Sequence, residues 1–243
     1  MSNNLCSIII GVKNGEAFIK RAIDSVVNQS YNDWELIVVD DGSTDKTSMI
    51  VKSYCNSDSR IRYIYQSHKG ISCARNNGIR NSKGKYCVFL DADDSLTYDS
   101  IAIRVNDMIT YDVGLSWYSH ILCNQNGQSS KSISGDDSQE NKNEFLNRVK
   151  NFEAGVTTGL EYVWDKIFDL NTIKCSKVYF DENMDRFEDR CYILQYLEVT
   201  EKNVYCSSNS VVHYYVNPNS VSHTRDSLLY TINNLRIQYK AMV

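Results

Sequence analysis

Short apolar runs alternate with amphipathic segments over the first ~115 residues, a pattern typical of βαβ units that form a helix-covered parallel sheet. The β-branched run at Ser7–Ile10 is uninterrupted, as in strands buried on both faces, and predicts a central strand. Apolar residues within Glu16–Gln29 recur with a 3.6-residue period, which predicts a helix. Similar patterns predict strands at Leu36–Val39, Arg62–Tyr65 and Tyr86–Leu90 and a helix at Ile71–Asn81. We expect an α/β fold with a mostly parallel central sheet flanked by helices.

The pattern changes in the second half of the chain. Apolar and polar residues alternate from Asp112 to Cys123, which predicts a half-buried strand. Residues 124–142 are mostly small, polar or charged, so this segment cannot bury a face and is expected to be a loop or lid. Later patterns predict helices near Asn143–Phe152 and Asp189–Leu197, strands near Val204 and at Ser210–Val216, and a closing amphipathic helix from about Ser227.

Two clusters of carboxylates follow predicted strands directly. Asp40 and Asp41 come after the second strand, and Asp91, Asp93 and Asp94 come after the fourth. Ligands of open α/β sheets bind beyond the carboxyl ends of the strands, so the two clusters predict one shared crevice. Ionised carboxylates ~4 Å apart repel by roughly 4 kcal/mol at an effective dielectric near 20, and a cation relieves that repulsion. Oxygen ligands favour Mg²⁺ or Mn²⁺, whereas the alternative is a solvated acidic turn that caps a helix.

Composition limits which binding partners and which cellular compartment we expect. The chain has 26 Lys and Arg against 30 Asp and Glu, and its net charge of −4 gives no general attraction to nucleic acid. The eight cysteines form no CxxC pair and Met1–Asn4 contains no Lys or Arg, which together favour a reducing, cytoplasmic setting. No apolar run reaches the ~20 residues of a membrane helix, so any membrane contact is expected to be peripheral.

Six segments stand out because of their order along the chain. They read SIIIGVKNGEAFIKRAIDSVVNQSYNDWELIVVDDGSTD (7–45), GISCARNNGI (70–79), GKYCVFLDADD (84–94), VWDKIF (163–168), FED (187–189) and YYVNPNS (214–220). Together they resemble the family 2 glycosyltransferases of the GT-A fold, especially bacterial capsule and lipopolysaccharide enzymes. The resemblance implies a nucleotide-sugar-binding α/β half at 1–123, a polar loop or lid at 124–142, and an acceptor-side and C-terminal helical extension of the same domain at 143–243.

The resemblance also implies how the donor is bound. Asp41 would hydrogen-bond the nucleotide base with Asp40 in support, and Arg75 would be a cation near the base and diphosphate. The alternative for Arg75 is a surface charge on a helix. The family commonly has Pro-x-Tyr-Asn after the first strand, but this chain has Gly-Val-Lys-Asn at positions 11–14. Val12 and Lys13 are therefore expected at the donor, with the stem of Lys13 along the base or its amine at the phosphates.

For the transfer step, the DADD segment matches the family's DxD motif. Asp91 and Asp93 would bridge a divalent metal to the diphosphate, with Asp93 as the preferred direct ligand and Asp94 next. Glu188 and Asp189 align with the ED motif, so Asp189 would take the proton of the acceptor hydroxyl beside Glu188. The resemblance implies a single displacement that inverts the anomeric centre. The alternative is that both acids only favour a helix N-terminus, an effect worth ~0.3–1 kcal/mol.

The acceptor side carries fewer matches. Trp164 and Lys166 match a W-x-K segment that tends to line the acceptor in this family, whereas the alternative is a tryptophan that fills the core. His213 is expected to be a core or rim histidine, with a metal or phosphate contact as the alternative. His223 and Arg225 are candidates to close over the diphosphate.

The leading hypothesis is a cytoplasmic enzyme, free or at the inner face of the membrane, that transfers a sugar from a UDP-linked donor to a saccharide or lipid-linked acceptor in surface polysaccharide biosynthesis. A glycoside hydrolase with paired carboxylates at Asp93 and Asp189 is one rival, but it leaves Asp41 and Arg75 without a role. A non-catalytic nucleotide-sugar-binding relative is another, prompted by the residues at positions 11–14. The sequence predicts neither the sugar, nor the linkage, nor the oligomeric state.

Overall fold

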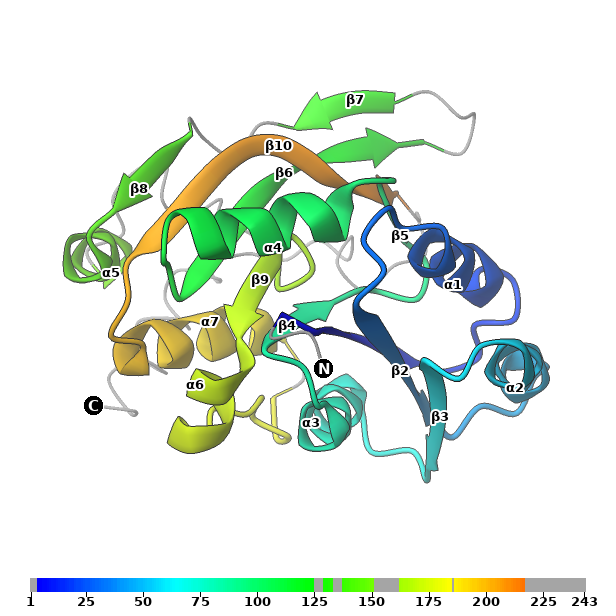
Figure 1. The fold of residues 1–243 in the computed structure, drawn as a ribbon. Coiled ribbons are helices and arrows are strands. Elements are labelled where there is room, and N and C mark those ends of the chain that lie inside the picture. Colours follow the sequence, from blue (N-terminus) through cyan, green and yellow to red (C-terminus); the bar gives the residue numbers. More distant parts are fainter. Residues whose placement is uncertain (1–3, 125–128, 133–136, 151–161, 185, 217–243) are drawn as a thin grey trace.

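The computed structural model describes residues 4–124, 129–132, 137–150, 162–184 and 186–216. Within these residues one ten-stranded sheet has the order β3-β2-β1-β4-β9-β6-β10-β5, with β7 paired to β6 and β8 to β10 (Figure 1). The strands are β1 (Cys6–Val12), β2 (Trp34–Asp41), β3 (Ile61–Gln66), β4 (Tyr86–Phe89), β5 (Ser95–Leu96), β6 (Leu115–Cys123), β7 (Ser129–Ser132), β8 (Ser138–Glu140), β9 (Lys166–Asp169) and β10 (Val204–Tyr215). The helices are α1 (Ile19–Val27), α2 (Thr47–Ser57), α3 (Ile71–Asn81), α4 (Ser100–Thr110), α5 (Lys142–Lys150), α6 (Leu170–Ser176) and α7 (Glu188–Val199).

The first four strands form the parallel half of the sheet. β1 pairs in parallel with both β2 and β4, and β2 pairs in parallel with β3. The strand order therefore reverses beside β1, the place where α/β sheets bind ligands at their carboxyl ends. Ile8, Ile9 and Ile10 are at most 1% exposed, which confirms the prediction of a central strand buried on both faces.

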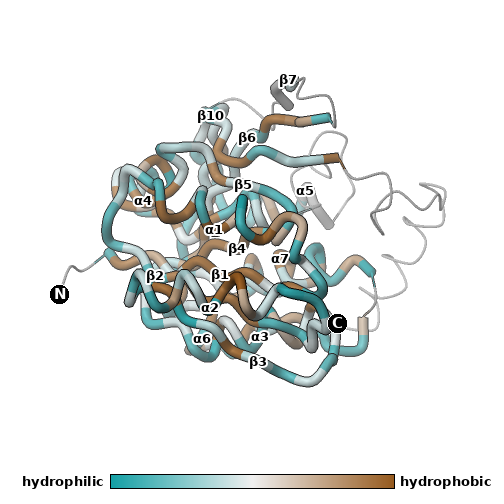
Figure 2. The backbone as a smooth tube through the Cα atoms, turned by 90° about the vertical axis from the view of Figure 1, so that its right-hand side faces the viewer, coloured by the Kyte–Doolittle hydropathy of each residue, from teal (hydrophilic) through white to brown (hydrophobic). Residues whose placement is uncertain are grey.

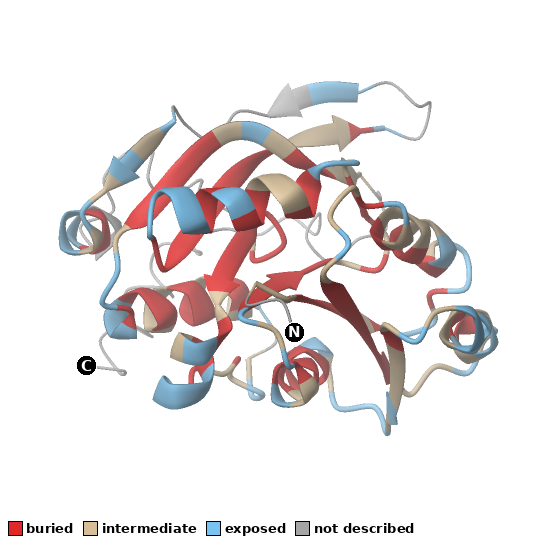
Figure 3. Ribbon diagram, viewed as in Figure 1, coloured by how far each residue is buried: buried red, intermediate tan, exposed pale blue. Residues whose placement is uncertain are grey.

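Two hydrophobic clusters fill the space on the two faces of the sheet. Ile8 and Ile10 belong to a cluster that includes residues of α1, α2 and α4, whereas Ile9 belongs to a cluster that includes residues of α3, α5, α6 and α7. Figure 2 shows apolar segments gathered in the middle of the molecule, and Figure 3 shows helices whose buried sides face the sheet. The sheet is thus the middle of three layers.

Most predicted elements of the first half are present. The helix at Ile71–Asn81 is confirmed with its predicted limits, and each of the predicted strands at Leu36–Val39, Arg62–Tyr65 and Tyr86–Leu90 has a counterpart. The first helix begins only at Ile19, because residues 14–16 form a loop whose backbone donates to side chains of the β2–α2 loop. The elements α4, β5, α6 and β9 were not predicted.

Three predictions for the second half were wrong. Residues 115–119 of β6 are buried on both faces rather than alternating, since Ser116 and Tyr118 contact α4 and Leu115 and Trp117 belong to the cluster on the opposite face. The expected polar loop at 124–142 contains β7 and β8, which add backbone pairing without burying an apolar face. The two strands expected after 203 are one strand, β10, with an irregular register between Ser207 and Val212.

The predicted closing helix, His223 and Arg225 lie outside the described residues. Within the described residues, no helix has the length and apolar character needed to cross a bilayer.

Candidate functional site

Helix α3 packs closely against β1 because two glycines leave room for it. A Cβ atom at Gly11 would lie 2.7 Å from Cδ1 of Ile71 and 3.3 Å from Cβ of Ala74. A Cβ atom at Gly78 would lie 2.3 Å from Cγ2 of Ile9. Gly11, a departure from the usual family pattern, therefore has a packing cause that is independent of the donor.

Polar residues of α3 connect segments that are distant in the sequence. The side chain of Asn76 donates to the carbonyl of Phe180 at 2.9 Å and to Glu182 at 3.0 Å, and it accepts from the Phe180 amide at 2.8 Å. Asn77 donates to the side-chain oxygen of Gln66 at 2.9 Å. The ARNN segment thus fixes both the loop before α3 and the segment that leads to α7.

Arg75 joins the two predicted acidic motifs. Its Nη1 lies 2.6 Å from Oδ1 of Asp189 and 3.3 Å from Oε1 of Glu188, and its Nη2 lies 3.0 Å from Oδ1 of Asp91. The arginine is only 5% exposed, so these charge-assisted bonds form in a largely desolvated place. Burial opposes the guanidinium charge, but the carboxylates together raise the pKa of Arg75. The structure therefore brings Asp91 and the Glu188–Asp189 pair together around one cation.

Asp189 has an environment suited to proton transfer. It is 9% exposed, and its Oδ2 accepts from the Val163 amide at 3.2 Å. Burial raises the pKa of Asp189 to about 7 against the opposing effect of Arg75. The residue at the start of the same helix, Phe187, has a left-handed backbone with φ of 65°, a conformation that costs ~1–3 kcal/mol for a non-glycine residue and is frequent at functional sites.

The three aspartates after β4 have different environments. The Asp91 side chain is 33% exposed. Asp93 is more buried, and this burial together with the nearby Asp91 raises the pKa of Asp93. Asp94 is fully buried, its Oδ1 accepts from the Tyr215 amide at 2.9 Å, and burial raises its pKa to about 9. Asp94 thus holds the end of β10, and Asp91 and Asp93 are the more accessible pair. Arg21 was not predicted: it donates to the Asp93 carbonyl and lies 3.6 Å from the ring centre of Tyr215.

Asp41 accepts hydrogen bonds from the loop that leads into α3. Its Oδ1 accepts from the Gln66 side chain at 2.9 Å and the Lys69 amide at 2.8 Å. Its Oδ2 accepts from the Gly70 amide at 2.9 Å and lies 2.6 Å from Nδ1 of His68. Burial acts to raise the pKa of Asp41, but these four bonds lower it. The carboxylate is therefore ionised and fully engaged.

Asp41 and the Arg75 cluster are separate groups along one helix. In the described part of the chain, no hydrogen bond or ion pair joins Asp41 to Asp91, Glu188 or Asp189. Both groups nevertheless contact α3, Asp41 at its N-cap and the other acids through Arg75 in the next turn.

The other predicted donor residues divide between interior and surface. Asp40 is fully buried, and it accepts from the Ser43 amide at 2.8 Å and from the Tyr63 hydroxyl at 2.6 Å. Val12 is 4% exposed at the end of β1, and Lys13 is exposed just beyond it. Asp40 and Val12 therefore support the loops, and only Lys13 presents its side chain to solvent.

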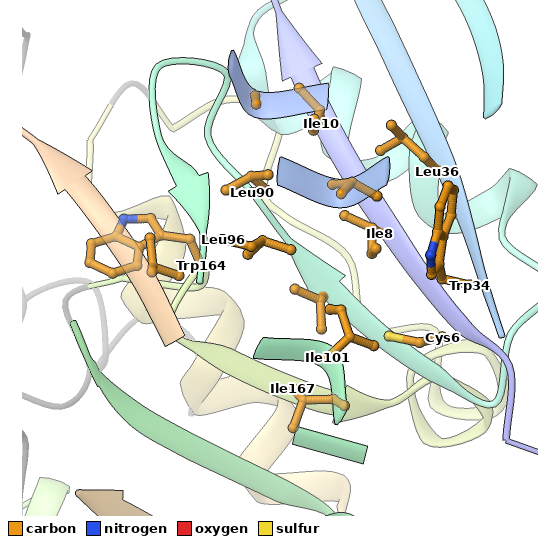
Figure 4. Packing of buried hydrophobic residues seen from close by; sticks show 14 of the residues in the cluster. Cys6, Ile8, Ile10, Trp34, Leu36, Leu90, Leu96, Ile101, Trp164 and Ile167 are labelled. Carbon is orange, nitrogen blue, oxygen red and sulfur yellow. The ribbon is translucent and has the colours of Figure 1, made fainter. Parts of the chain in front are cut away.

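Trp164 and Lys166 do not line an open surface, so this prediction was wrong and the core alternative holds. They are 1% and 0% exposed, and Figure 4 shows Trp164 among buried apolar side chains. Lys166 pairs with Asp165 at 2.6 Å. The guanidinium of Arg104, which is also fully buried, donates to the carbonyls of Trp164 at 2.9 Å and Lys166 at 3.0 Å. Burial lowers the pKa of Arg104 to about 10, and no local sequence signal marked it.

His213 lies within the sheet, two residues before Tyr215, whose amide donates to Asp94. It is opposite Ser95 in the β10–β5 pair, and its Nδ1 lies 3.7 Å from Sγ of Cys123. Burial lowers the pKa of His213, which favours the neutral imidazole. A rim position in the sheet, one of the two expected for it, fits these contacts.

The chain is similar to proteins of one enzyme class. A family model described as "Glycosyl transferase family 2" matches residues 7–162. The uncharacterized glycosyltransferase EpsJ of Bacillus subtilis (strain 168) is 32% identical over 222 residues, which cover 90% of this chain and 63% of EpsJ. The putative teichuronic acid biosynthesis glycosyltransferase TuaG of the same strain is 34% identical over 124 residues, 51% of this chain and 49% of TuaG.

Solved structures share the fold. S. aureus TarS 1–349 in complex with UDP matches 88% of this chain and 61% of that chain with a TM-score of 0.72 at 19% identity. The complex of the same protein with UDP-GlcNAc matches 91% of this chain with a TM-score of 0.75. The present chain thus spans less than two thirds of the length of EpsJ, TuaG and TarS 1–349.

Proposed function

Because the chain belongs to glycosyl transferase family 2, we propose that it transfers a sugar from a UDP-linked donor to a saccharide or lipid-linked acceptor in the synthesis of a cell-surface polysaccharide. One observation carries the proposal: Arg75 holds Asp91, from the donor-side motif, and Asp189, from the acceptor-side motif, around a single guanidinium. Two similar proteins support the surface-polysaccharide role and the UDP-linked donor, since TuaG is named for teichuronic acid biosynthesis and TarS has been crystallised with UDP.

In the proposed reaction, the acceptor hydroxyl oxygen forms a bond to the anomeric carbon of the donor sugar. The bond from that carbon to the diphosphate breaks, and its electron pair leaves with the nucleoside diphosphate. Asp189 accepts the hydroxyl proton as the new bond forms, a role that requires its ionised form. The raised pKa of Asp189 makes it a stronger base than an exposed aspartate. A single displacement of this kind inverts the anomeric centre.

Asp91 and Asp93 fit a divalent cation. They lie two positions apart, and the pKa of Asp93 is raised by burial and by Asp91, so a positive charge between them would relieve an unfavourable arrangement. Mg²⁺ or Mn²⁺ at this place would stabilise the charge that develops on the leaving diphosphate. Among the described residues, no three His, Cys, Asp or Glu side chains lie together in a way that could hold a metal ion. Two carboxylates plus phosphate oxygens are the usual Mg²⁺ arrangement.

The test combines binding and turnover. Thermal shift is measured with UDP, GDP and several UDP-sugars, with and without Mn²⁺, and donor hydrolysis is then followed. We expect metal-dependent stabilisation by UDP or a UDP-sugar together with slow hydrolysis, both lost in Asp93→Ala. An absence of any nucleotide effect under both conditions would contradict the proposal, whereas nucleotide binding without hydrolysis or transfer would favour a non-catalytic relative.

A further inference from the structure

The peptide group between Tyr162 and Val163 is hydrogen-bonded on both of its sides. Its N–H, which belongs to Val163, donates to Oδ2 of Asp189 at 3.2 Å. Its carbonyl, which belongs to Tyr162, accepts from Nζ of Lys166 at 2.7 Å. Because the N–H and the C=O of one peptide group lie in one plane, a group that holds the carbonyl also sets the direction of the N–H. Lys166 is therefore linked to Asp189 through a single rigid unit.

Lys166 is itself held firmly inside the molecule. It is 0% exposed, and its Nζ lies 2.6 Å from Oδ1 of Asp165, whose side chain is 4% exposed. Its backbone amide donates to the Val163 carbonyl at 3.2 Å and so closes a turn. Arg104 of α4 donates to the carbonyls of Trp164 and Lys166 in the same turn. A shift of this turn would therefore break hydrogen bonds of two buried cations.

The ion pair of Asp165 and Lys166 is a weak source of stability. Removing two charges from water costs several kcal/mol per ion, so apolar residues of similar volume often stabilise a core as well as a buried pair does. The pair is neutral as a whole, so it adds little net charge near Asp189. An apolar pair could not supply the hydrogen bond to the Tyr162 carbonyl. The specific contribution of Lys166 therefore lies in that bond.

The Asp189 carboxylate is held from two sides. Its Oδ1 accepts from Nη1 of Arg75 at 2.6 Å, and its Oδ2 accepts from the Val163 amide. Donors on both oxygens fix the plane of the carboxylate, whereas Arg75 alone would leave it free to turn about one bond. A general base must lie within hydrogen-bond reach of the hydroxyl whose proton it takes, and a small misplacement of a reacting group lowers the rate. The Val163 amide is therefore part of what aligns the proposed base.

We infer that Lys166 is a positioning residue for the transfer step: it orients the Val163 amide, which in turn aligns the Asp189 carboxylate with the acceptor hydroxyl. The inference rests on the proposed function, in which Asp189 is the base. Lys166 is fully buried and acts from inside the core, so it affects turnover and not nucleotide binding. The buried W-x-K segment thus has a role in the reaction that needs no contact with the acceptor.

The test variant combines Asp165→Asn with Lys166→Met. It removes the ammonium that bonds the Tyr162 carbonyl, and it leaves no unpaired charge in the core. A second neutral pair, Asp165→Leu with Lys166→Met, fills the same space with apolar atoms only, so the test does not depend on the folding of one variant. Circular dichroism checks that each variant folds.

The matched control combines Glu35→Gln with Arg62→Met. Arg62 also pairs with a buried carboxylate, that of Glu35 at 2.8 Å, and also donates to a backbone carbonyl, that of Asn81 at 2.6 Å. Within the described residues, no hydrogen bond joins this pair to Asp189. The control therefore makes a similar chemical change at a place that is not linked to the proposed base.

Three quantities are measured with Mn²⁺ present. Turnover is the release of UDP from whichever UDP-sugar the chain hydrolyses fastest, with water in place of the acceptor hydroxyl, and it is separated into kcat and KM. Affinity for UDP is measured by titration calorimetry, and amide hydrogen exchange is followed at Val163. Turnover is also measured after each pair of substitutions is combined with Asp189→Asn.

We expect both neutral pairs at 165 and 166 to lower kcat about tenfold, the scale of one hydrogen bond. Affinity for UDP and KM should stay within twofold, and exchange at Val163 should quicken. The control should leave all of these unchanged. With Asp189→Asn the same neutral pairs should lower kcat less than twofold, because the base that Lys166 positions is then absent.

Two results would overturn the inference. An equal loss of kcat with and without Asp189→Asn would mean that Lys166 only supports the fold, and unchanged exchange at Val163 would mean that the ammonium does not hold the peptide group. Failure of the unsubstituted chain to bind UDP or to release it from any UDP-sugar would instead contradict the proposed function, while exchange at Val163 would still test the link.

Discussion

Asp41 and Asp189 are both largely buried carboxylates beside α3, yet their environments have opposite effects. Asp41 accepts four hydrogen bonds from one loop, and its pKa is lowered. Asp189 accepts from one amide and from Arg75, and burial raises its pKa to about 7. Burial alone therefore does not determine the charge state, because the number of donors decides whether ionisation is favoured. The first carboxylate suits an anchor and the second suits a base.

The largest expected effect comes from Asp189→Asn. An amide keeps the shape and can still accept from Arg75, but it cannot take a proton, so transfer should fall by about 10²- to 10⁴-fold. Nucleotide affinity should stay within a few-fold, because the amide oxygen keeps the hydrogen bond that holds Arg75 in place. Single-turnover transfer and calorimetry measure the two quantities. Equal loss of both would contradict the role of Asp189 as the base.

Among these substitutions, Arg75→Gln should lower the free energy of unfolding most. It removes the cation that compensates three carboxylates, and breaking a buried ion pair typically costs about 3–5 kcal/mol of unfolding free energy. The matched control is Arg80→Gln on the same helix. Arg80 is 52% exposed and lies 3.5 Å from Glu182, so its loss should cost less than about 1 kcal/mol. Urea unfolding compares them, and similar losses would show that the Arg75 cluster is not strongly coupled.

The pH dependence of transfer distinguishes the two carboxylates without any substitution. Asp189 must be ionised to act, so kcat/KM should rise with pH to a plateau, with a midpoint near the pKa of about 7. Below it the rate should fall about tenfold per pH unit. A midpoint near 4, typical of an ordinary carboxylate, would exclude Asp189 as the base.

The same shift in Asp189 affects stability. Its folded-state pKa is raised above the unfolded value, so the native state binds more protons between pH ~4 and ~7, and its contribution to stability falls as the pH rises through that window. Asp41 behaves in the opposite way. Its lowered pKa gives stability that is present above its unfolded pKa near 4 and is lost on further acidification.

Asp41→Asn should destabilise the chain less than Arg75→Gln does. An asparagine has one acceptor oxygen, so about half of the four hydrogen bonds are lost, at a cost of roughly 1–3 kcal/mol. Hydrogen exchange should quicken at the amides of Lys69 and Gly70 and remain unchanged around Asp189. Unchanged exchange at residues 69 and 70 would contradict the view of Asp41 as an anchor.

The sequence was most informative where a local pattern decides the structure. The uninterrupted run at Ser7–Ile10 and the periodicity of 71–81 depend on neighbouring residues only, and both elements are present. The family resemblance and its α/β fold are confirmed by the match over residues 7–162 and by the TarS structures. The metal, the inverting step, the cytoplasmic location and the peripheral membrane contact stay predictions.

Contacts between distant residues could not be predicted. Arg75 pairs with Asp189, 114 positions later, and nothing in the spacing of either residue shows that the guanidinium faces carboxylates. The buried Arg104 donates to the carbonyl of Trp164, 60 positions away, and the Trp164 ring stacks on Tyr214, a further 50 positions along. The alternation in β6 was misleading because distant helices cover both of its faces: Ser116 and Tyr118 contact α4, and Trp117 packs on Phe145 of α5.

Helix α3 also sets the distance between its N-cap, which is bonded to Asp41, and Arg75. Its N-cap at Gly70 is bonded to Asp41, and Arg75 follows five residues later, which corresponds to ~7.5 Å along a helix axis at ~1.5 Å per residue. A nucleoside held at the first point and a sugar released at the second would be spaced by a rigid rod rather than by a flexible loop. Inserting one residue between them would turn the guanidinium by about 100° away from its acids, so this helix sets the distance between the Asp41 loop and the Arg75 cluster.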